Sequence, residues 1–211
     1  GSMLVKTVRR LTERPEGETP VFLIAAERHA GRIRADLAGI DLRGGGALFE
    51  PAGRNTAAAV ALATLRTLAG FGDSLMLVVP SDHEISTVRQ FWQSVEAGAA
   101  VAREGRLVVF GIRPMQPETG YGYIEVAADR NGIFDVSRFV EKPDLATAQR
   151  YVDAGNFYWN TGIFLFRASA MRDAFRAYQP AIWEAVEAAF EAATSDLSGL
   201  YMPIELYSAV P

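Results

Sequence analysis

Short apolar runs alternate along the first half of the chain with longer stretches whose apolar residues recur at helical spacing, as Ala58, Leu62 and Leu65 do. The strongest apolar run, residues 75–79, ends at Pro80. This pattern predicts strands at 21–25, 47–50, 75–79 and 107–111, and helices at 55–69 and 88–103. Strands that alternate with helices are typical of an α/β fold, here a mostly parallel central sheet with helices on both faces.

The pattern changes after residue 120. Runs at 121–126 and 133–140 are joined by Asp129-Arg130-Asn131-Gly132, and Asn-Gly favours a hairpin turn, so we expect a small antiparallel insertion. Asp144 is placed to cap a helix that continues through Tyr151. A long strand at 157–166 and two helices, the second opening at Pro180, complete a predicted core domain of residues 4–195. Residues 196–211 have no clear period and are predicted to be an irregular tail.

The composition of the chain narrows the range of possible functions. The chain has 211 residues, a net charge of −4, no cysteine and two histidines, which excludes a disulfide scaffold, a thiol nucleophile and a Cys- or His-rich metal site. The acidic balance argues against nucleic-acid binding. Every apolar run is far shorter than the ~20 residues that span a bilayer, so we expect no membrane insertion and a cytoplasmic location. Gly1 and Ser2 ahead of Met3 resemble the remnant of a cleaved tag.

Polar residues gather where predicted strands end, the place where open α/β sheets bind ligands. The first group follows the strand at 47–50 and contains Glu50, Arg54, Asn55 and Thr56. Asn55 or Thr56 could simply cap the helix that begins there. Alternatively, these side chains and the first helical amides could read the edge of a nucleobase.

The second group, Ser81 and Asp82, follows the most apolar strand. A carboxylate there points toward the ligand crevice, and with a nucleoside triphosphate it would hold Mg²⁺, which takes one or two carboxylates together with phosphate oxygens. An ordinary turn is the alternative, because Ser-Asp sequences form Asx turns.

Three further groups suit a sugar phosphate. Glycines flanked by aromatic residues leave the backbone open to close approach, an acid beside a base can bind hydroxyls and neutralise a phosphate, and an amide in a buried strand requires hydrogen-bond partners. The residues concerned are Gly122 and Tyr123, Glu141 and Lys142, and Asn160 and Thr161. A tight turn and a surface ion pair are the plainer interpretations of the first two groups.

Together, residues 50–57, 80–83, 119–123, 141–143 and 159–162 resemble the sugar-nucleotide pyrophosphorylases of the nucleotide-diphospho-sugar transferase fold. The likeness is greatest to the mannose-1-phosphate guanylyltransferases, including the bifunctional type with a mannose-6-phosphate isomerase domain. The resemblance implies a Rossmann-like enzyme that transfers GMP from GTP to mannose 1-phosphate, giving GDP-mannose and pyrophosphate with Mg²⁺ as cofactor.

The resemblance also implies roles for single residues. Asp82 and Lys142 would be the catalytic pair, with Asp82 on the metal and Lys142 on the sugar phosphate. The nucleotide site would comprise Glu50, Arg54, Asn55, Thr56, Ser81 and Asp82, with guanine on Asn55 and Thr56. The sugar site would comprise Gly122, Tyr123, Glu141, Lys142, Asn160 and Thr161.

The sequence departs from the family pattern at two places. The glycine-rich phosphate loop of the type G-G-x-G-T-R-L-x-P has no match, and residues 4–11 resemble the helix that follows that loop. The second metal aspartate of the family has no match in residues 201–211, and no isomerase domain follows. We therefore expect a core fragment whose turnover is impaired, because preorganised contacts to the phosphates are lost.

Three alternatives stay open at this point. The chain could belong to a pyrophosphorylase for another sugar 1-phosphate, or it could be a non-catalytic module that binds sugar nucleotides. It could also be an inactive fragment that self-associates through exposed strand edges, which leaves a homo-oligomer open.

Overall fold

The computed structural model describes residues 1–13, 19–130 and 132–211. Its strands are β1 (Phe22–Ala26), β2 (Gly46–Glu50), β3 (Leu75–Val78), β4 (Val108–Ile112), β5 (Tyr123–Arg130), β6 (Ile133–Val140), β7 (Phe157–Arg167), β8 (Thr194–Asp196) and β9 (Gly199–Tyr201). Its helices are α1 (Met3–Thr12), the 3-10 turn η1 (Glu27–His29), α2 (Ala30–Asp36), α3 (Asn55–Phe71), α4 (Val88–Arg103), α5 (Leu145–Ala154), α6 (Ala168–Tyr178), α7 (Pro180–Glu191) and α8 (Ile204–Tyr207). The predicted α/β class is confirmed.

The first sheet contains the parallel pairing that the sequence predicts. Its order is β1-β2-β9-β8, and β1 runs parallel to β2 from the pair Phe22 and Gly46 to the pair Ala26 and Glu50. Strand β9 is also parallel to β2, whereas β8 and β9 form an antiparallel pair.

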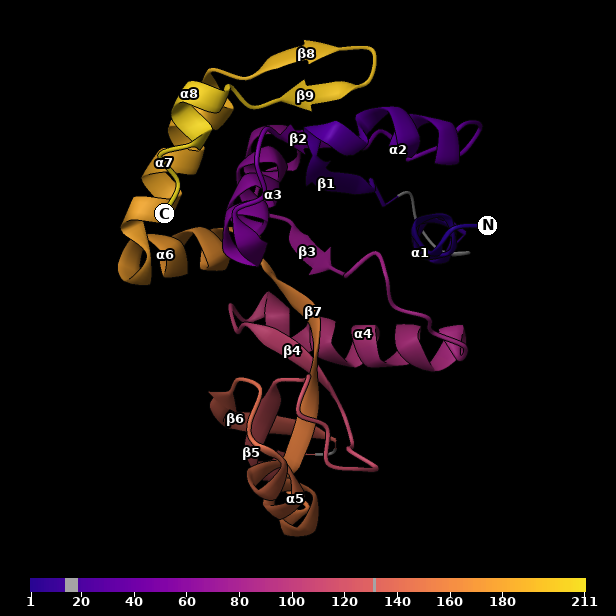
Figure 1. Cartoon of the computed structure of the whole chain (residues 1–211), viewed down its shortest axis with the longest axis vertical. Helices are drawn as coiled ribbons and strands as arrows, with labels where there is room; N and C mark the ends of the chain where they lie inside the picture. Colours follow the sequence, from indigo (N-terminus) through magenta and orange to yellow (C-terminus); the bar gives the residue numbers. More distant parts are fainter. Residues whose placement is uncertain (14–18, 131) are drawn as a thin grey trace.

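The second sheet is antiparallel throughout the described residues, so the parallel pairs are confined to the first sheet. Strand β7, 11 residues long, pairs with β3 near its end, with β5 near its start and with β4 from Trp159 to Leu165, and β6 continues the sheet beyond β5. In Figure 1 this strand runs from α6 down into the lower part of the molecule. One long strand thereby connects the region of the first sheet with the antiparallel insertion.

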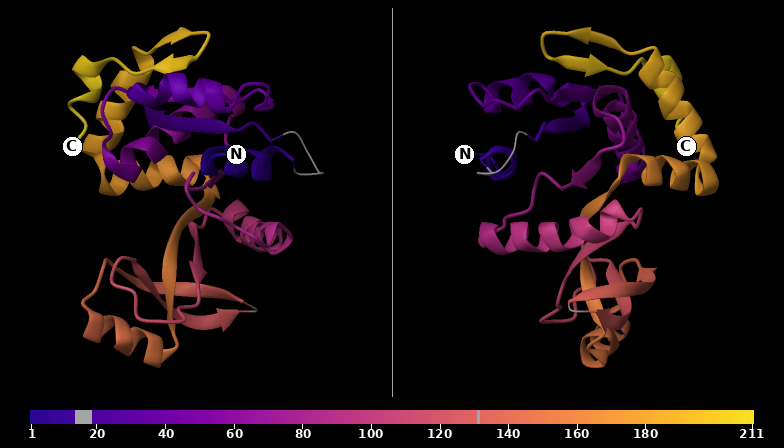
Figure 2. Two further views of the ribbon diagram at one scale, coloured as in Figure 1. Left: turned by 45° about the vertical axis from the view of Figure 1, so that its right-hand side comes forward. Right: turned by 180° about the vertical axis from the view of Figure 1, so that it is seen from behind.

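The main core lies around α3, which is buried along much of its length. Ala58, Ala61 and Leu62 have no exposed surface, and they pack with Phe166 of β7 and Val186 of α7. Helices α6 and α7 pack against α3, and Figure 2 shows this group of helices from two sides. None of the helices within the described ranges is long and apolar enough to cross a membrane.

The prediction of an irregular tail is wrong. Residues 194–207 form β8, β9 and α8, and Met202, Tyr207 and Val210 are at most 3% exposed. Strands of three residues are too short to show a period in the sequence, and a four-residue helix has barely one turn. The tail is part of the core domain because β9 extends the sheet beside β2.

The insertion and the helix after it form as expected. Strands β5 and β6 pair antiparallel, while Asn131 of the predicted turn lies outside the described residues. The Asp144 carboxylate accepts the Thr147 amide at 2.8 Å, so the predicted cap is confirmed. Helix α5 ends at Ala154 and is capped by Gly155, whose φ of 72° lies in the left-handed region that glycine adopts most readily.

Candidate functional site

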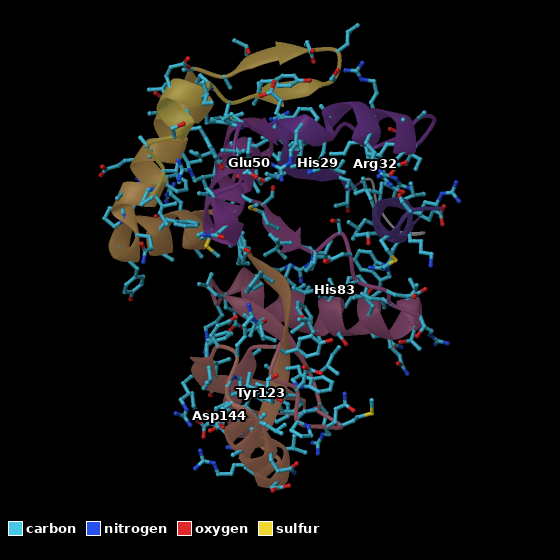
Figure 3. The ribbon with its side chains drawn as sticks, viewed as in Figure 1. His29, Arg32, Glu50, His83, Tyr123 and Asp144 are labelled. Carbon is cyan, nitrogen blue, oxygen red and sulfur yellow. The ribbon has the colours of Figure 1, made fainter. Side chains whose placement is uncertain are left out.

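A groove of about 1520 Å³ separates the edges of the two sheets. Strands β1 and β3 are the terminal strands of their sheets, and both line the groove together with α1, α3 and α4. Figure 3 shows Glu50 above this region and His83 below it. Of the residues predicted from the sequence, the groove is lined by Glu50, Arg54, Asn55, Thr56, Ser81, Asp82 and Asn160.

The turn between β2 and α3 brings the first polar group to the groove. Helix α3 begins at Asn55, which has a φ of 62°, and Asn55 and Thr56 are both exposed. The cap residue is Arg54, and no side chain of the described residues caps the helix. The interpretation of Asn55 and Thr56 as ordinary helix caps is therefore wrong. The first amides of α3 stay available at the groove, where a helix N-terminus favours a polar or anionic group.

Glu50 and Arg54 of this turn contact the C-terminal segment. The buried Glu50 carboxylate accepts a hydrogen bond from the Tyr207 hydroxyl, and Arg54 Nη2 donates to the carbonyl of Ser208 at 2.8 Å. Burial raises the pKa of Glu50, and the Tyr207 hydrogen bond offsets part of this effect. The sequence prediction missed Tyr207 because the tail shows no periodicity.

Ser81 and Asp82 lie in the exposed turn after β3, and α1 holds this turn in place. Thr7 Oγ1 donates to the Ser81 carbonyl at 3.5 Å, and Arg10 Nη2 donates to the His83 carbonyl at 3.0 Å. Burial lowers the pKa of Arg10. The sequence of α1 does not signal this contact, because it joins residues more than 70 positions apart.

Asp82 offers one carboxylate to a metal ion, and a Mg²⁺ ion held there would complete its shell with phosphate oxygens and water. In the part of the chain that the structure describes, no group of three or more acidic, His or Cys side chains could hold a metal. Asp82 lines the groove and is exposed, so its carboxylate is accessible to an ion bound in the groove. One carboxylate with phosphate ligands is a usual arrangement for this ion.

Three of the predicted sugar-site residues, Gly122, Glu141 and Asn160, lie together, and we call them the sugar-site cluster. A β-carbon on Gly122 would be 3.1 Å from Glu141 Oε2 and 3.7 Å from the β-carbon of Asn160. The backbone N–H of Asn160 donates to the Gly122 carbonyl at 2.8 Å. Lys142 Nζ is 3.6 Å from Glu141 Oε1, and Lys142 has a φ of 39°. The pairing of β5 with β7 explains this cluster because it places Gly122 directly beside Asn160.

The sugar-site cluster is connected to the groove through the end of β3. Asn160 lines the groove, and its Oδ1 accepts the Gly162 amide at 3.0 Å. Gly162 has a φ of 66°, and a β-carbon there would lie 3.4 Å from Cγ of Pro80. Pro80 directly precedes Ser81, so Asn160 is shared by the two ends of the site.

Tyr123 and Thr161 do not fit the predicted sugar contact. Tyr123 has no exposed surface, packs beside Phe157, and its hydroxyl donates to the Glu118 carbonyl at 2.9 Å. Thr161 Oγ1 donates to the Phe110 carbonyl at 2.7 Å. A fully buried ring cannot touch a sugar, so the prediction for the Tyr123 side chain is wrong, and the Thr161 hydroxyl serves the pairing of β4 with β7.

The class of protein to which the chain belongs is one of nucleotide-transferring proteins. Residues 1–200 match the family described as nucleotidyl transferase, and the chain belongs to that family.

Comparison with individual proteins is more specific than the family match. The chain is 44% identical to xanthan biosynthesis protein XanB of Xanthomonas campestris pv. campestris (strain B100) over 190 residues, which are 90% of this chain and 40% of that protein. It is 42% identical to mannose-1-phosphate guanylyltransferase of Escherichia coli (strain K12) over 217 residues, which cover 100% of this chain and 45% of that protein. The chain thus spans less than half the length of these curated relatives.

Two solved structures share the fold over almost the whole chain. One is described as mannose-6-phosphate isomerase from Helicobacter pylori, with a TM-score of 0.85, 28% identity, and coverage of 98% of this chain and 79% of that one. The other is described as mannose-1-phosphate geranyltransferase from Thermus thermophilus, with a TM-score of 0.83, 30% identity, and coverage of 100% of this chain and 58% of that one.

Proposed function

We propose that the chain is the nucleotidyltransferase part of an enzyme that moves GMP from GTP to mannose 1-phosphate, releasing pyrophosphate and forming GDP-mannose. The partners are then small molecules in the cytoplasm. The observation that carries this proposal is the position of Asn160, which lines the groove beside the nucleotide-side residues and also contacts Gly122 of the sugar-site cluster. One continuous site of this kind suits a ligand with a base at one end and a sugar at the other.

Each end of the site has a role in this proposal. The side chains of Asn55 and Thr56 and the uncapped amides of α3 would bind the guanine. The Glu141 carboxylate would accept hydrogen bonds from sugar hydroxyls, and the side-chain NH₂ of Asn160 would donate one. The lack of a side chain at Gly122 would leave room for the sugar ring. The names of the curated mannose-1-phosphate guanylyltransferases support GTP and mannose 1-phosphate over other pairs.

The reaction makes few demands on acid–base chemistry. A phosphate oxygen of mannose 1-phosphate attacks the α-phosphorus of GTP, a new P–O bond forms, and the bond to the leaving pyrophosphate breaks. With a second pKa of ~6 the sugar phosphate is already ionised at neutral pH. Catalysis then rests on holding two anions in line and stabilising the developing charge.

Lys142 and Asp82 would supply the charges. The Lys142 ammonium, exposed beside Glu141, would orient the attacking phosphate. Asp82 would hold Mg²⁺, which supplies positive charge to the phosphates when it is bound. The turn that carries Asp82 would keep its place through the contacts of Thr7 and Arg10 from α1.

Calorimetric titration of the chain with GDP-mannose tests the proposal, with and without Mg²⁺ and beside dTDP-glucose. We expect GDP-mannose to bind at least about tenfold more tightly than dTDP-glucose, because the base and the hexose both differ. Equal affinity for both would favour a pyrophosphorylase for another sugar. Binding of neither would contradict the proposal for this chain. Pyrophosphate exchange, measured separately, distinguishes an enzyme from a binding module.

A further inference from the structure

The turn that presents Asn55 is held at both ends by one short piece of chain. At its start, the Glu50 carboxylate accepts the hydrogen bond of Tyr207. At its end, Arg54 donates to the carbonyl of Ser208, the residue directly after Tyr207. We call residues 203–208 the C-terminal clamp, because this segment contacts both ends of the turn.

The C-terminal clamp is itself firmly attached to the core domain. The Met202 amide donates to the Phe49 carbonyl at 3.0 Å, continuing the pairing of β9 with β2. Tyr207 has no exposed surface, and Val210 after it is 1% exposed. Helix α8 packs on α7, and Figure 1 shows the two side by side. The clamp therefore offers fixed partners to the turn.

The turn needs such partners because its backbone is strained. Asn55 has a φ of 62°, a left-handed conformation that costs some free energy even though asparagine adopts it more readily than other non-glycine residues. The two anchors bracket the turn immediately before Asn55. Burial of Glu50 and Tyr207 keeps their hydrogen bond away from competing water.

We propose that the C-terminal clamp positions the nucleobase end of the groove, with Tyr207 as the positioning residue and Glu50 as its acceptor. Glu50 is then a structural acceptor and not a reader of the base. Base recognition falls to Asn55, Thr56 and the uncapped amides of α3. This inference rests on the proposed function for the identity of the ligand, while the positioning itself can be measured in the ligand-free chain.

The variant Tyr207→Phe tests the clamp because it removes one hydroxyl and keeps the ring. We expect amide hydrogen exchange in the turn, residues 51–56, to accelerate about fivefold or more, with the rest of the chain unchanged. We expect the affinity for GDP-mannose to fall about tenfold, as for loss of a hydrogen bond to a charged group. Affinity for mannose 1-phosphate stays within about twofold, because the sugar-site cluster belongs to the second sheet and the clamp is attached to the first.

Two variants separate positioning from general loss of stability. Tyr201→Phe removes the hydroxyl of another tail tyrosine, whose ring packs on Phe49 with centroids 4.9 Å apart, and it should leave exchange in the turn unchanged. Glu50→Gln keeps an acceptor oxygen for Tyr207 and should retain most of the protection. If Tyr207 only stabilised the fold, its loss would lower the affinity for both GDP-mannose and mannose 1-phosphate. Glu50→Gln would then not retain the protection of the turn.

The double variant Tyr207→Phe, Glu50→Ala decides whether Glu50 also touches the base. If Glu50 acts only through its hydrogen bond with Tyr207, the double variant binds GDP-mannose no more weakly than Tyr207→Phe alone, because the second substitution removes a contact that is already lost. A further loss of affinity in the double variant would overturn the assignment of Glu50 as a structural acceptor. Unchanged exchange in Tyr207→Phe would overturn the clamp itself. Failure of the wild-type chain to bind any guanosine nucleotide would contradict the proposed function instead.

Discussion

Gly122 faces the Glu141 carboxylate so closely that a β-carbon on Gly122 would lie 3.1 Å from Oε2. The two residues flank the open end of the β5–β6 hairpin, next to the pair Tyr123 and Val140, and Asn160 of the neighbouring strand completes the contact. Because the nearest atom belongs to a flexible side chain, an added methyl group would displace the carboxylate and leave the backbone in place.

The variant Gly122→Ala is therefore expected to weaken mannose 1-phosphate binding about tenfold while it changes stability by less than ~1 kcal/mol. Gly120→Ala is the matched control, because its β-carbon would meet Glu118 Oε1 at an ordinary 3.5 Å. Titration calorimetry and thermal unfolding of both variants check the prediction. Equal losses of affinity in the two variants would argue against a sugar contact at Gly122.

Asp82 provides a second test at the other end of the site. Asp82→Asn removes the charge that would hold Mg²⁺, so the added affinity for GTP in the presence of Mg²⁺ should shrink by about tenfold or more, with binding in its absence little changed. Glu84→Gln, in the same turn but paired with Lys6 at 2.9 Å, is the control and should keep the full Mg²⁺ effect. A metal effect that survives in Asp82→Asn would place the ion elsewhere.

The local pattern of the sequence was enough for most elements. Helix α4 spans the predicted residues 88–103 because its apolar face is regular from end to end, with Phe91, Val95 and Ala102 buried. The prediction for Asp144 was equally local, since a cap depends on residues three positions apart. Elements of this kind can be predicted because the residues that form them are close together in the sequence.

The rest depended on contacts between distant residues. Tyr207 meets Glu50 across 157 positions, and Arg10 meets His83 across 73, so no spacing rule could pair them. The error for Tyr123 has a different origin: an aromatic residue beside glycine suits a sugar, but it also suits the core, and only burial decides between the two. The sequence was enough to choose candidate site residues, but it could not identify the distant residues that hold them in place.

The close approach of β4 to β7 gives a stability prediction. A β-carbon on Gly111 would lie 2.7 Å from the β-carbon of Tyr158, which cannot move without moving β7. Gly111→Ala should therefore destabilise the chain by ~1–3 kcal/mol, as overpacking does. Gly46→Ala, where a β-carbon meets open space in β2, should stay within ~0.5 kcal/mol. Urea unfolding of both variants measures the difference.

Glu50 links the clamp to pH. Burial raises its pKa above the ordinary 4.5, so the folded state holds the proton more tightly than the unfolded state does. Unfolding then releases a proton, and the free energy of unfolding falls as pH rises from about 4.5 through the raised pKa of the folded state. Glu50→Gln removes this dependence and keeps an acceptor for Tyr207. We therefore expect the Tm of the wild-type chain, relative to Glu50→Gln, to fall as pH rises through this window and to level off above it. A Tm difference that stays constant from about pH 4 to about pH 8 would show that Glu50 does not titrate with folding.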